Sequence, residues 1–177
     1  MKQNEMKQME VGKSGLTVSR ISMGTLPMGG ESVWGDCDNQ ESIRTIHASR
    51  ACGINFFDTA PAYGFGRSED FCVKPGDARS RILWYQPERR KKVLCMLASW
   101  EDLWKKYKCS PAALNLAWML AQAPNVNVDA GSRKAKNMET NAAGGSITLE
   151  AEDLNRMNQD IALLHRQYQT QGNQEHP

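Results

Sequence analysis

The chain has 177 residues, 40% of them hydrophobic and 24% charged, which is typical of one globular domain. Its net charge of +2 is too small to indicate nucleic acid or an acidic membrane as a partner, and its five scattered cysteines indicate neither a zinc site nor a disulfide framework. Because the N-terminus has no apolar leader and no apolar run approaches about 18 residues, we expect a cytoplasmic protein without a membrane span.

The N-terminal part of the chain predicts a β-hairpin followed by a βαβ unit. Residues 9–22 alternate apolar and polar side chains around a Lys-Ser-Gly turn, which indicates the hairpin. A short strand over 20–25 then opens into a glycine-rich loop. Apolar residues at helical spacing predict a helix over 39–52, which Gly53 ends. The apolar run over 54–58 predicts a second strand, with Asp58 at its C-terminal end.

The C-terminal part predicts mainly helices. We expect a helix over 93–107, a helix from Pro111 to about residue 122, a strand over 126–129 followed by a turn and a helix, and a last helix over 151–165. Residues 72–85 follow no helix or strand period and are interpreted as a junction. The sequence therefore predicts a single domain over 9–165, with flexible tails at 1–8 and 166–177.

Four segments together resemble a known family. They read "SGLTVSRISMGT", "GINFFDTAPAYGFGRSE", "SPAALNLAWMLAQ" and "GSRKAKNMETNAAGGSITLEAEDL", and the Asp-Thr-Ala-x-x-Tyr-Gly pattern within the second is the most specific. These segments are similar to the aldo-keto reductases, in particular to the bacterial branch of that TIM-barrel family. The resemblance implies an α/β fold of the (β/α)8 type and an NADP-dependent oxidoreductase that reduces a small aldehyde or ketone to an alcohol.

The resemblance also implies a set of site residues. Tyr63 matches the proton donor of the family, and Asp58 matches the aspartate that organises it. The matched cofactor-binding residues are Asp58 itself, Gly24, Thr25 and Leu26 beside the nicotinamide, Gly131, Ser132 and Arg133 at the 2′-phosphate of NADP(H), and Asn137 and Asn141 near the adenine. The segment after Gly131 has an independent reading, because free N–H groups at a helix start attract phosphate. No metal site is expected.

Two partners of the proton donor have no counterpart in the sequence. In the family, a lysine lowers the pKa of the tyrosine, and a histidine lies nearby. Lys74 is the candidate substitute for the lysine in this sequence, and it is a poor one. A free tyrosine titrates near pH 10, so a cationic neighbour is needed for proton exchange near neutrality. The sequence predicts an internal loss near 72–85, which leaves a partial barrel of parallel strands 8-1-2. We therefore expect lost or reduced activity, and self-association through open sheet edges.

Other interpretations remain open. The chain could be a non-catalytic interaction protein or a remnant that only binds NADP. Residues 79–92 are basic and contain Trp84 and Tyr85, a composition that weak single-strand nucleic-acid binding would use, although nucleic acid is not the expected partner. Two charged residues, Arg50 and Asp129, occupy positions that are usually apolar in the family that the chain resembles. A buried unpaired charge would be costly, so both positions suggest either relaxed constraint or a local pairing.

Overall fold

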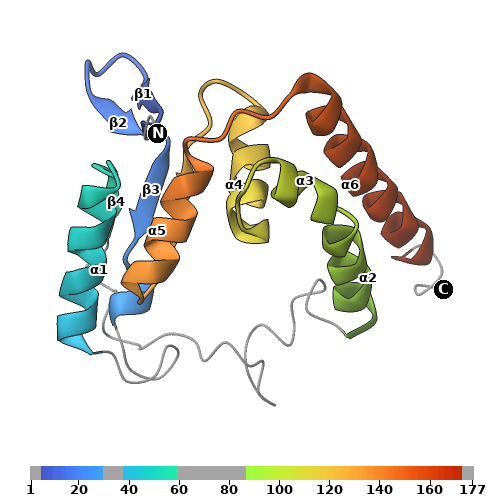
Figure 1. The fold of residues 1–177 in the computed structure, drawn as a ribbon, viewed down its shortest axis with the longest axis horizontal. Helices are drawn as coiled ribbons and strands as arrows, with labels where there is room; N and C mark the ends of the chain where they lie inside the picture. The colour runs from blue at the N-terminus through green and yellow to red at the C-terminus, as the bar shows by residue number, and fades with distance from the viewer. Residues whose placement is uncertain (1–4, 30–37, 60–86, 173–177) are drawn as a thin grey trace. The chain divides into compact units, whose positions relative to one another are not determined.

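The computed structural model describes residues 5–29, 38–59 and 87–172 (Figure 1). The chain forms two compact units, where the sequence predicts one domain over 9–165. The first, called the sheet unit, comprises Met1–Cys72 and Ala112–Thr148. The second, called the helical unit, comprises Val73–Pro111 and Leu149–Pro177. The candidate site residues in the described ranges all belong to the sheet unit.

The predicted N-terminal hairpin is confirmed. Strand β1 (Gln8–Glu10) pairs antiparallel with strand β2 (Thr17–Ser19). The connecting turn uses Gly12 and Gly15 with φ of 55° and 73°, a left-handed conformation that favours glycine. Just before the hairpin, the Lys7 ammonium donates a hydrogen bond of 2.9 Å to the carbonyl of Ile147. Residues 7 and 8, expected in a flexible tail, are therefore part of the folded unit.

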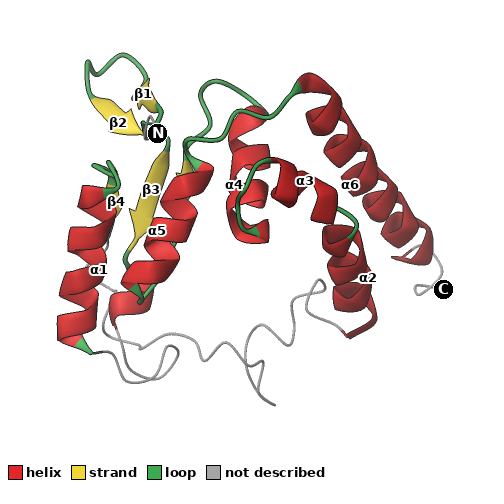
Figure 2. Ribbon diagram, viewed as in Figure 1, coloured by secondary structure: helices red, strands yellow, loops and turns green. Residues whose placement is uncertain are grey.

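A parallel sheet of three short strands lies at the centre of the sheet unit (Figure 2). Strand β3 (Ile21–Gly24) lies between β4 (Phe57–Asp58) and β5 (Val128–Asp129), in the order β4-β3-β5. This is the order expected for strands 2, 1 and 8 of a partial barrel. The two outer strands are shorter than the sequence predicts, and the described residues form no closed barrel.

Helices α1 (Asn39–Ala51) and α5 (Ala135–Gly144) lie side by side and pack with the sheet (Figure 1). Helix α1 begins where the Asp38 side chain accepts a hydrogen bond from Gln40 N, and it ends before Gly53, whose φ is 86°. Both ends agree with the prediction. The core shared by these elements consists of buried apolar residues: Ile21, Met23, Ile54, Leu120, Val128, Ala130, Met138 and Ala142.

Helix α4 (Pro111–Ala121) begins at the expected proline, and its C-terminal end is held by an arginine from the sheet. The Arg20 guanidinium donates to the carbonyls of Leu120 at 2.6 Å, Ala123 at 2.7 Å and Val126 at 3.1 Å. The Leu120 carbonyl belongs to the last turn of α4, where carbonyls lack a helical donor, whereas the Ala123 carbonyl also accepts a hydrogen bond of 3.3 Å from the Val126 N–H. Arg20 therefore connects β3, the end of α4 and the chain entering β5.

The expectation that Arg50 carries a charge on a buried face is wrong. Arg50 is exposed in the last turn of α1, where a cation also complements the negative end of the helix dipole. The buried face of α1 is made instead by Thr45 and Ser49, each of which donates its hydroxyl to a carbonyl one turn earlier. The Ser49 hydroxyl also lies 3.0 Å from the Met23 sulfur, so this face of α1 lies against β3.

The helical unit contains α2 (Pro87–Ala98), α3 (Glu101–Lys106) and α6 (Ala151–Gly172). The single helix predicted over 93–107 is wrong, because the chain breaks between α2 and α3 at Trp100. This side chain is 1% exposed, and its indole N–H donates to Asp160 of α6 at 2.8 Å. Burial of a large aromatic side chain with a satisfied N–H outweighs the continuity of the helical stripe.

Helix α6 continues beyond residue 165, where the sequence predicts a flexible tail. Tyr168 is 5% exposed, and its hydroxyl donates to the carbonyl of Arg89 at 3.0 Å. The Arg89 guanidinium lies 4.5 Å and the Lys92 ammonium 5.3 Å from the centre of the Tyr168 ring. The contacts of Tyr168 extend the packed part of α6 by almost one turn. The predicted flexible tail is wrong over 166–172, because one buried aromatic residue outweighs the low apolar content of this segment.

Candidate functional site

The C-terminal edge of the parallel sheet brings Asp58 beside the loop that follows β3. Gly24 lies opposite Asp58 in the strand register, and the Asp58 carbonyl accepts two hydrogen bonds from Thr25, one from its N–H at 3.0 Å and one from its hydroxyl at 2.6 Å. Parallel strands place their C-terminal ends at one edge, where α/β proteins bind ligands. Asp58 and Leu26 are exposed at this edge, while Gly24 is buried.

Asp129 reaches the same edge from the other side of β3. Its carboxylate lies 2.6 Å from the position that a Cβ on Gly24 would occupy, and it accepts a hydrogen bond of 3.2 Å from the Ser22 hydroxyl. Partial burial raises the pKa of Asp129, and the negative charge of Asp58 raises it further, while the Ser22 hydrogen bond opposes both. Asp129 is therefore not a buried unpaired charge, because it is exposed and has the Ser22 hydroxyl as a donor, in line with the local pairing that the sequence left open.

The loop before α5 lies against the loop after β3. A Cβ on Gly131 would lie 3.2 Å from the Pro27 ring and 3.5 Å from the Gly24 carbonyl oxygen, so glycine permits this close approach. The reason for glycine here is therefore contact between two loops rather than a left-handed turn. The predicted nicotinamide loop and the predicted phosphate loop are brought together by this contact.

The start of α5 is built by residues 132–135. Ser132 is 5% exposed, and its hydroxyl accepts a hydrogen bond of 3.0 Å from the Lys134 N–H. Lys134 itself is exposed and Arg133 is half-buried, so two cations flank the N-terminal end of the helix. Asn137 and Asn141 follow one turn apart on α5, and Asn141 is half-buried. These residues suit an anionic ligand, although their contact with a cofactor stays a prediction.

Glu41 is a residue of this region that the sequence reasoning missed. It lies in the first turn of α1, and its Oε1 accepts a hydrogen bond of 3.3 Å from the Ala135 N–H at the start of α5. Its Oε2 accepts from the Arg44 guanidinium at 2.7 Å. The Arg44 hydrogen bonds lower the pKa of Glu41, and the Ala135 N–H lowers it further. No sequence signal showed that the starts of α1 and α5 would meet.

Tyr63, the predicted proton donor, lies outside the described residues, as does Lys74, so the geometry of the Asp58–Tyr63 pair stays a prediction. His47 is exposed on α1. The helical unit holds a cluster of the same residue types, in which Tyr107 donates to Asp153 and Lys106 donates to the same carboxylate at 2.7 Å. Burial raises the pKa of Tyr107, and its hydrogen bond to Asp153 raises it further.

The raised pKa of Tyr107 disfavours proton exchange by this cluster near neutral pH. The Tyr107 hydroxyl also accepts a hydrogen bond of 2.8 Å from the Glu150 N–H, directly before the first residue of α6. The cluster thus satisfies donors at the start of α6 and links it to α3.

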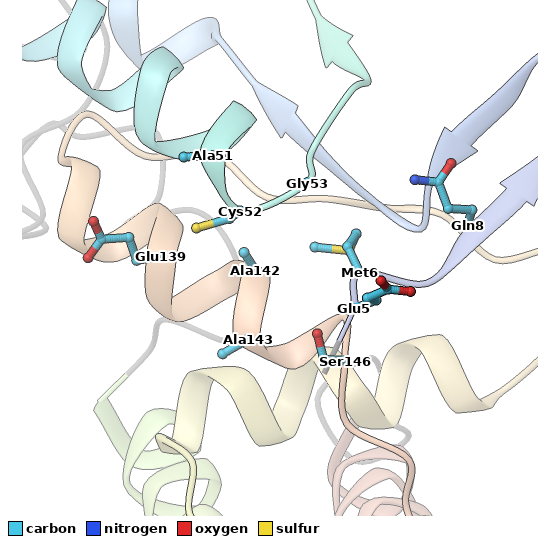
Figure 3. Close-up of a pocket in the computed structure, with 10 residues that line it drawn as sticks. All are labelled: Glu5, Met6, Gln8, Ala51, Cys52, Gly53, Glu139, Ala142, Ala143 and Ser146. Carbon is cyan, nitrogen blue, oxygen red and sulfur yellow. The ribbon is translucent and has the colours of Figure 1, made fainter. Parts of the chain in front are cut away.

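A separate cavity of about 550 Å³ lies in the sheet unit where the ends of α1 and α5 meet the N-terminal segment (Figure 3). Met6 from the N-terminal segment and Cys52 directly after α1 both line this cavity. Burial raises the pKa of the Cys52 thiol, so the thiolate is disfavoured.

In the described ranges, no group of three or more His, Cys, Asp or Glu side chains could hold a metal ion. No helix there is long and apolar enough to cross a membrane.

These features define an α/β protein with a candidate ligand site at the C-terminal edge of its parallel strands. Residues 20–93 match the model of the Aldo/keto reductase family. The chain is 48% identical over 65 residues to the NADH-specific methylglyoxal reductase of Escherichia coli, and 45% identical over 69 residues to the aldo-keto reductase YhdN of Bacillus subtilis. The two matches cover 36% and 39% of this chain.

A solved structure, the glycerol dehydrogenase of Gluconobacter oxydans, is similar in fold, with a TM-score of 0.70 and 15% identity over 92% of this chain and 96% of that one. Residues 20–93 are thus similar to the aldo-keto reductases, and the solved structure shows a similar fold. The match spans about a fifth of the length of the curated relatives, 20% of each of the two named above.

Proposed function

We propose that the chain is a cytoplasmic NADP(H)-binding protein of the aldo-keto reductase type, whose ability to reduce a small aldehyde or ketone is lost or reduced. The observation that carries this proposal is the parallel register of β4, β3 and β5. It brings Asp58, the loop from Gly24 and the start of α5 to one edge of the sheet. The family relationship supports a nicotinamide cofactor, and the 2′-phosphate is the finer part of the proposal.

The residues present fit such a cofactor. Gly131 leaves the space that a Cβ would fill between the two loops, and Arg133 and Lys134 bring positive charge to the N-terminal end of α5. We propose that the 2′-phosphate binds there with Ser132, that Asn137 and Asn141 lie near the adenine, and that Gly24, Thr25 and Leu26 border the nicotinamide. The cofactor, when bound, supplies the hydride.

Tyr63 donates the proton to the carbonyl oxygen of the substrate in this proposal, and Asp58 orients it. Because the sequence offers no counterpart of the lysine that would assist the tyrosine, proton transfer is slow in this proposal. Loss of general-acid tuning costs about 10²–10⁴ in rate. We therefore propose weak turnover or none, with cofactor binding retained.

An NADPH fluorescence titration of the purified full chain, with its size checked, tests the proposal. Saturable binding that the variant Arg133→Gln weakens is the expected result, and Arg90→Gln on the exposed face of α2 is the matched control. NADPH oxidation with small aldehydes, compared between wild type and Tyr63→Phe, then separates an enzyme from a binding remnant. Absence of NADPH binding would contradict the proposed function.

Nucleic-acid binding through residues 79–92 is a weaker candidate. Within the described part of this segment, Arg89 and Lys92 lie over the Tyr168 ring, so these two cations already have a partner inside the helical unit. A non-catalytic role, in which the open edges of the sheet pair with another chain, also stays a proposal. Concentration-dependent sedimentation with and without NADPH would detect it.

A further inference from the structure

The carboxylate of Glu41 lies at the start of α5, where the 2′-phosphate is proposed to bind. Helix α5 starts at Ala135, and the first N–H groups of a helix have no partner within it. In this chain, the Ala135 N–H donates to Glu41 Oε1 at 3.3 Å, and the preceding Lys134 N–H donates to the Ser132 hydroxyl at 3.0 Å. Two donors that a phosphate would use are thus already bound to acceptors of the protein itself.

Glu41 is fixed in this place by its own helix. Its second oxygen accepts from Arg44 Nη2 at 2.7 Å and from Arg44 Nε at 2.9 Å, three residues further along α1. Helices α1 and α5 pack along their length, so the first turn of one stays close to the first turn of the other (Figure 1). The hydrogen bonds from Arg44, followed by that from Ala135, lower the pKa of Glu41, which keeps it charged at neutral pH.

We infer that Glu41 is a specificity-determining residue, which disfavours a 2′-phosphate on the adenosine ribose and favours a free 2′-hydroxyl. This inference rests on the proposed function. A phosphate dianion entering the site must displace the carboxylate from the Ala135 N–H or lie beside it, and both cost binding free energy. A hydroxyl can instead donate a hydrogen bond to the same carboxylate, as acidic residues do at the ribose of NAD in dinucleotide-binding folds.

Residues with opposite effects on a phosphate meet at the start of α5. Ser132, Arg133 and Lys134 attract the phosphate, while Glu41 opposes it, so the chain should bind NADPH more weakly than these three residues alone would allow. Removal of the Glu41 charge should therefore improve binding of a phosphorylated ligand selectively. A residue that merely holds α1 against α5 would not produce this selectivity.

The test compares 2′,5′-ADP with 5′-ADP by isothermal titration calorimetry on the wild-type chain and on Glu41→Gln. We expect Glu41→Gln to bind 2′,5′-ADP about tenfold more tightly, because one repulsive charge beside the phosphate is removed. Binding of 5′-ADP should change less than threefold. The control is Glu139→Gln, which removes the same charge from the exposed surface further along α5 and should leave both affinities unchanged.

Equal affinities of wild type and Glu41→Gln for 2′,5′-ADP, or an equal change for both ligands, would overturn the inference and leave the proposed function intact. If neither chain binds either ligand, the proposed function falls, and the inference falls with it. Circular dichroism checks that the variant is folded. Should Glu41→Gln fail to fold, Glu41→Ala removes the same charge, and the same selective gain in 2′,5′-ADP affinity is required of it.

Discussion

Replacement of Arg20 by methionine should destabilise the sheet unit strongly, because one guanidinium satisfies three backbone carbonyls. The three hydrogen bonds have lengths of 2.6, 2.7 and 3.1 Å, and they join β3 to the end of α4 and to the chain before β5. A hydrogen bond from a charged group contributes about 1.5–3 kcal/mol, and a buried acceptor left unsatisfied costs about 1–3 kcal/mol. Methionine keeps the apolar part of the side chain, so lost packing adds little.

The three contributions do not simply add, because water reaches this half-buried site when the guanidinium is removed. A second effect opposes the loss: burial lowers the pKa of Lys7, the nearby Arg20 charge lowers it further, and removal of Arg20 relieves that repulsion. We therefore expect Arg20→Met to lower the free energy of unfolding by about 2–4 kcal/mol. In a chain of this size, that corresponds to about 6–12 °C in Tm.

Urea unfolding followed by circular dichroism and tryptophan fluorescence measures this change. The matched control is Arg50→Met, the same substitution at an exposed position of α1, which should change stability by less than about 0.5 kcal/mol. Arg20→Lys should fall between the two, because one ammonium group cannot reach all three carbonyls in the geometry of the planar guanidinium. Equal stability of Arg20→Met and Arg50→Met would refute the reasoning.

Three further predictions concern glycine packing and titration. Gly144→Ala should lower the free energy of unfolding, measured in urea, by about 1–3 kcal/mol, because the new Cβ would lie 2.7 Å from the Ala113 carbonyl oxygen. Gly24→Ala should cost less, because its Cβ would meet the Asp129 carboxylate, a side chain that can move. Asp129→Asn should stabilise the chain slightly at pH 7, because the raised pKa of Asp129 means that its ionisation disfavours the fold. Since this side chain is exposed, solvent screening keeps the gain small, and it should vanish in melts below about pH 3.5. Burial raises the pKa of Asp153, but hydrogen bonds from Lys106 and Tyr107 outweigh burial and lower the pKa. The ionised Asp153 therefore stabilises the fold above about pH 5, and this stabilisation is lost as the pH falls through the lowered pKa. Asp153→Asn should therefore show a flatter acid branch in a plot of Tm against pH, and an unchanged acid branch would contradict this.

Local sequence patterns predicted the elements whose ends depend on nearby residues. The hairpin, the limits of α1 and the proline start of α4 follow from glycine, proline and apolar spacing within a few residues. The order of the three parallel strands came from the family resemblance rather than from periodicity. The candidate edge with Asp58 and the start of α5 could be named for the same reason, since both lie in the matched segments.

Long-range contacts explain what the sequence did not predict. The break at Trp100 depends on Asp160, which lies 60 residues later, and the extension of α6 depends on the contact of Tyr168 with Arg89. Helical periodicity contains no information about such partners. The same limit hid Glu41, whose hydrogen-bond donor is 94 positions away along the chain.

The sequence by itself determined the α/β class of the fold, the candidate residues of a ligand site, and most of the local starts and stops of its helices. The tertiary structure alone decided which of those groups meet. It placed a carboxylate at the start of α5, exposed Arg50 and Asp129, and gave the Tyr107 cluster a structural role. The physical reason is that local conformation depends on neighbouring residues, whereas charge, burial and pKa depend on side chains that only folding brings together.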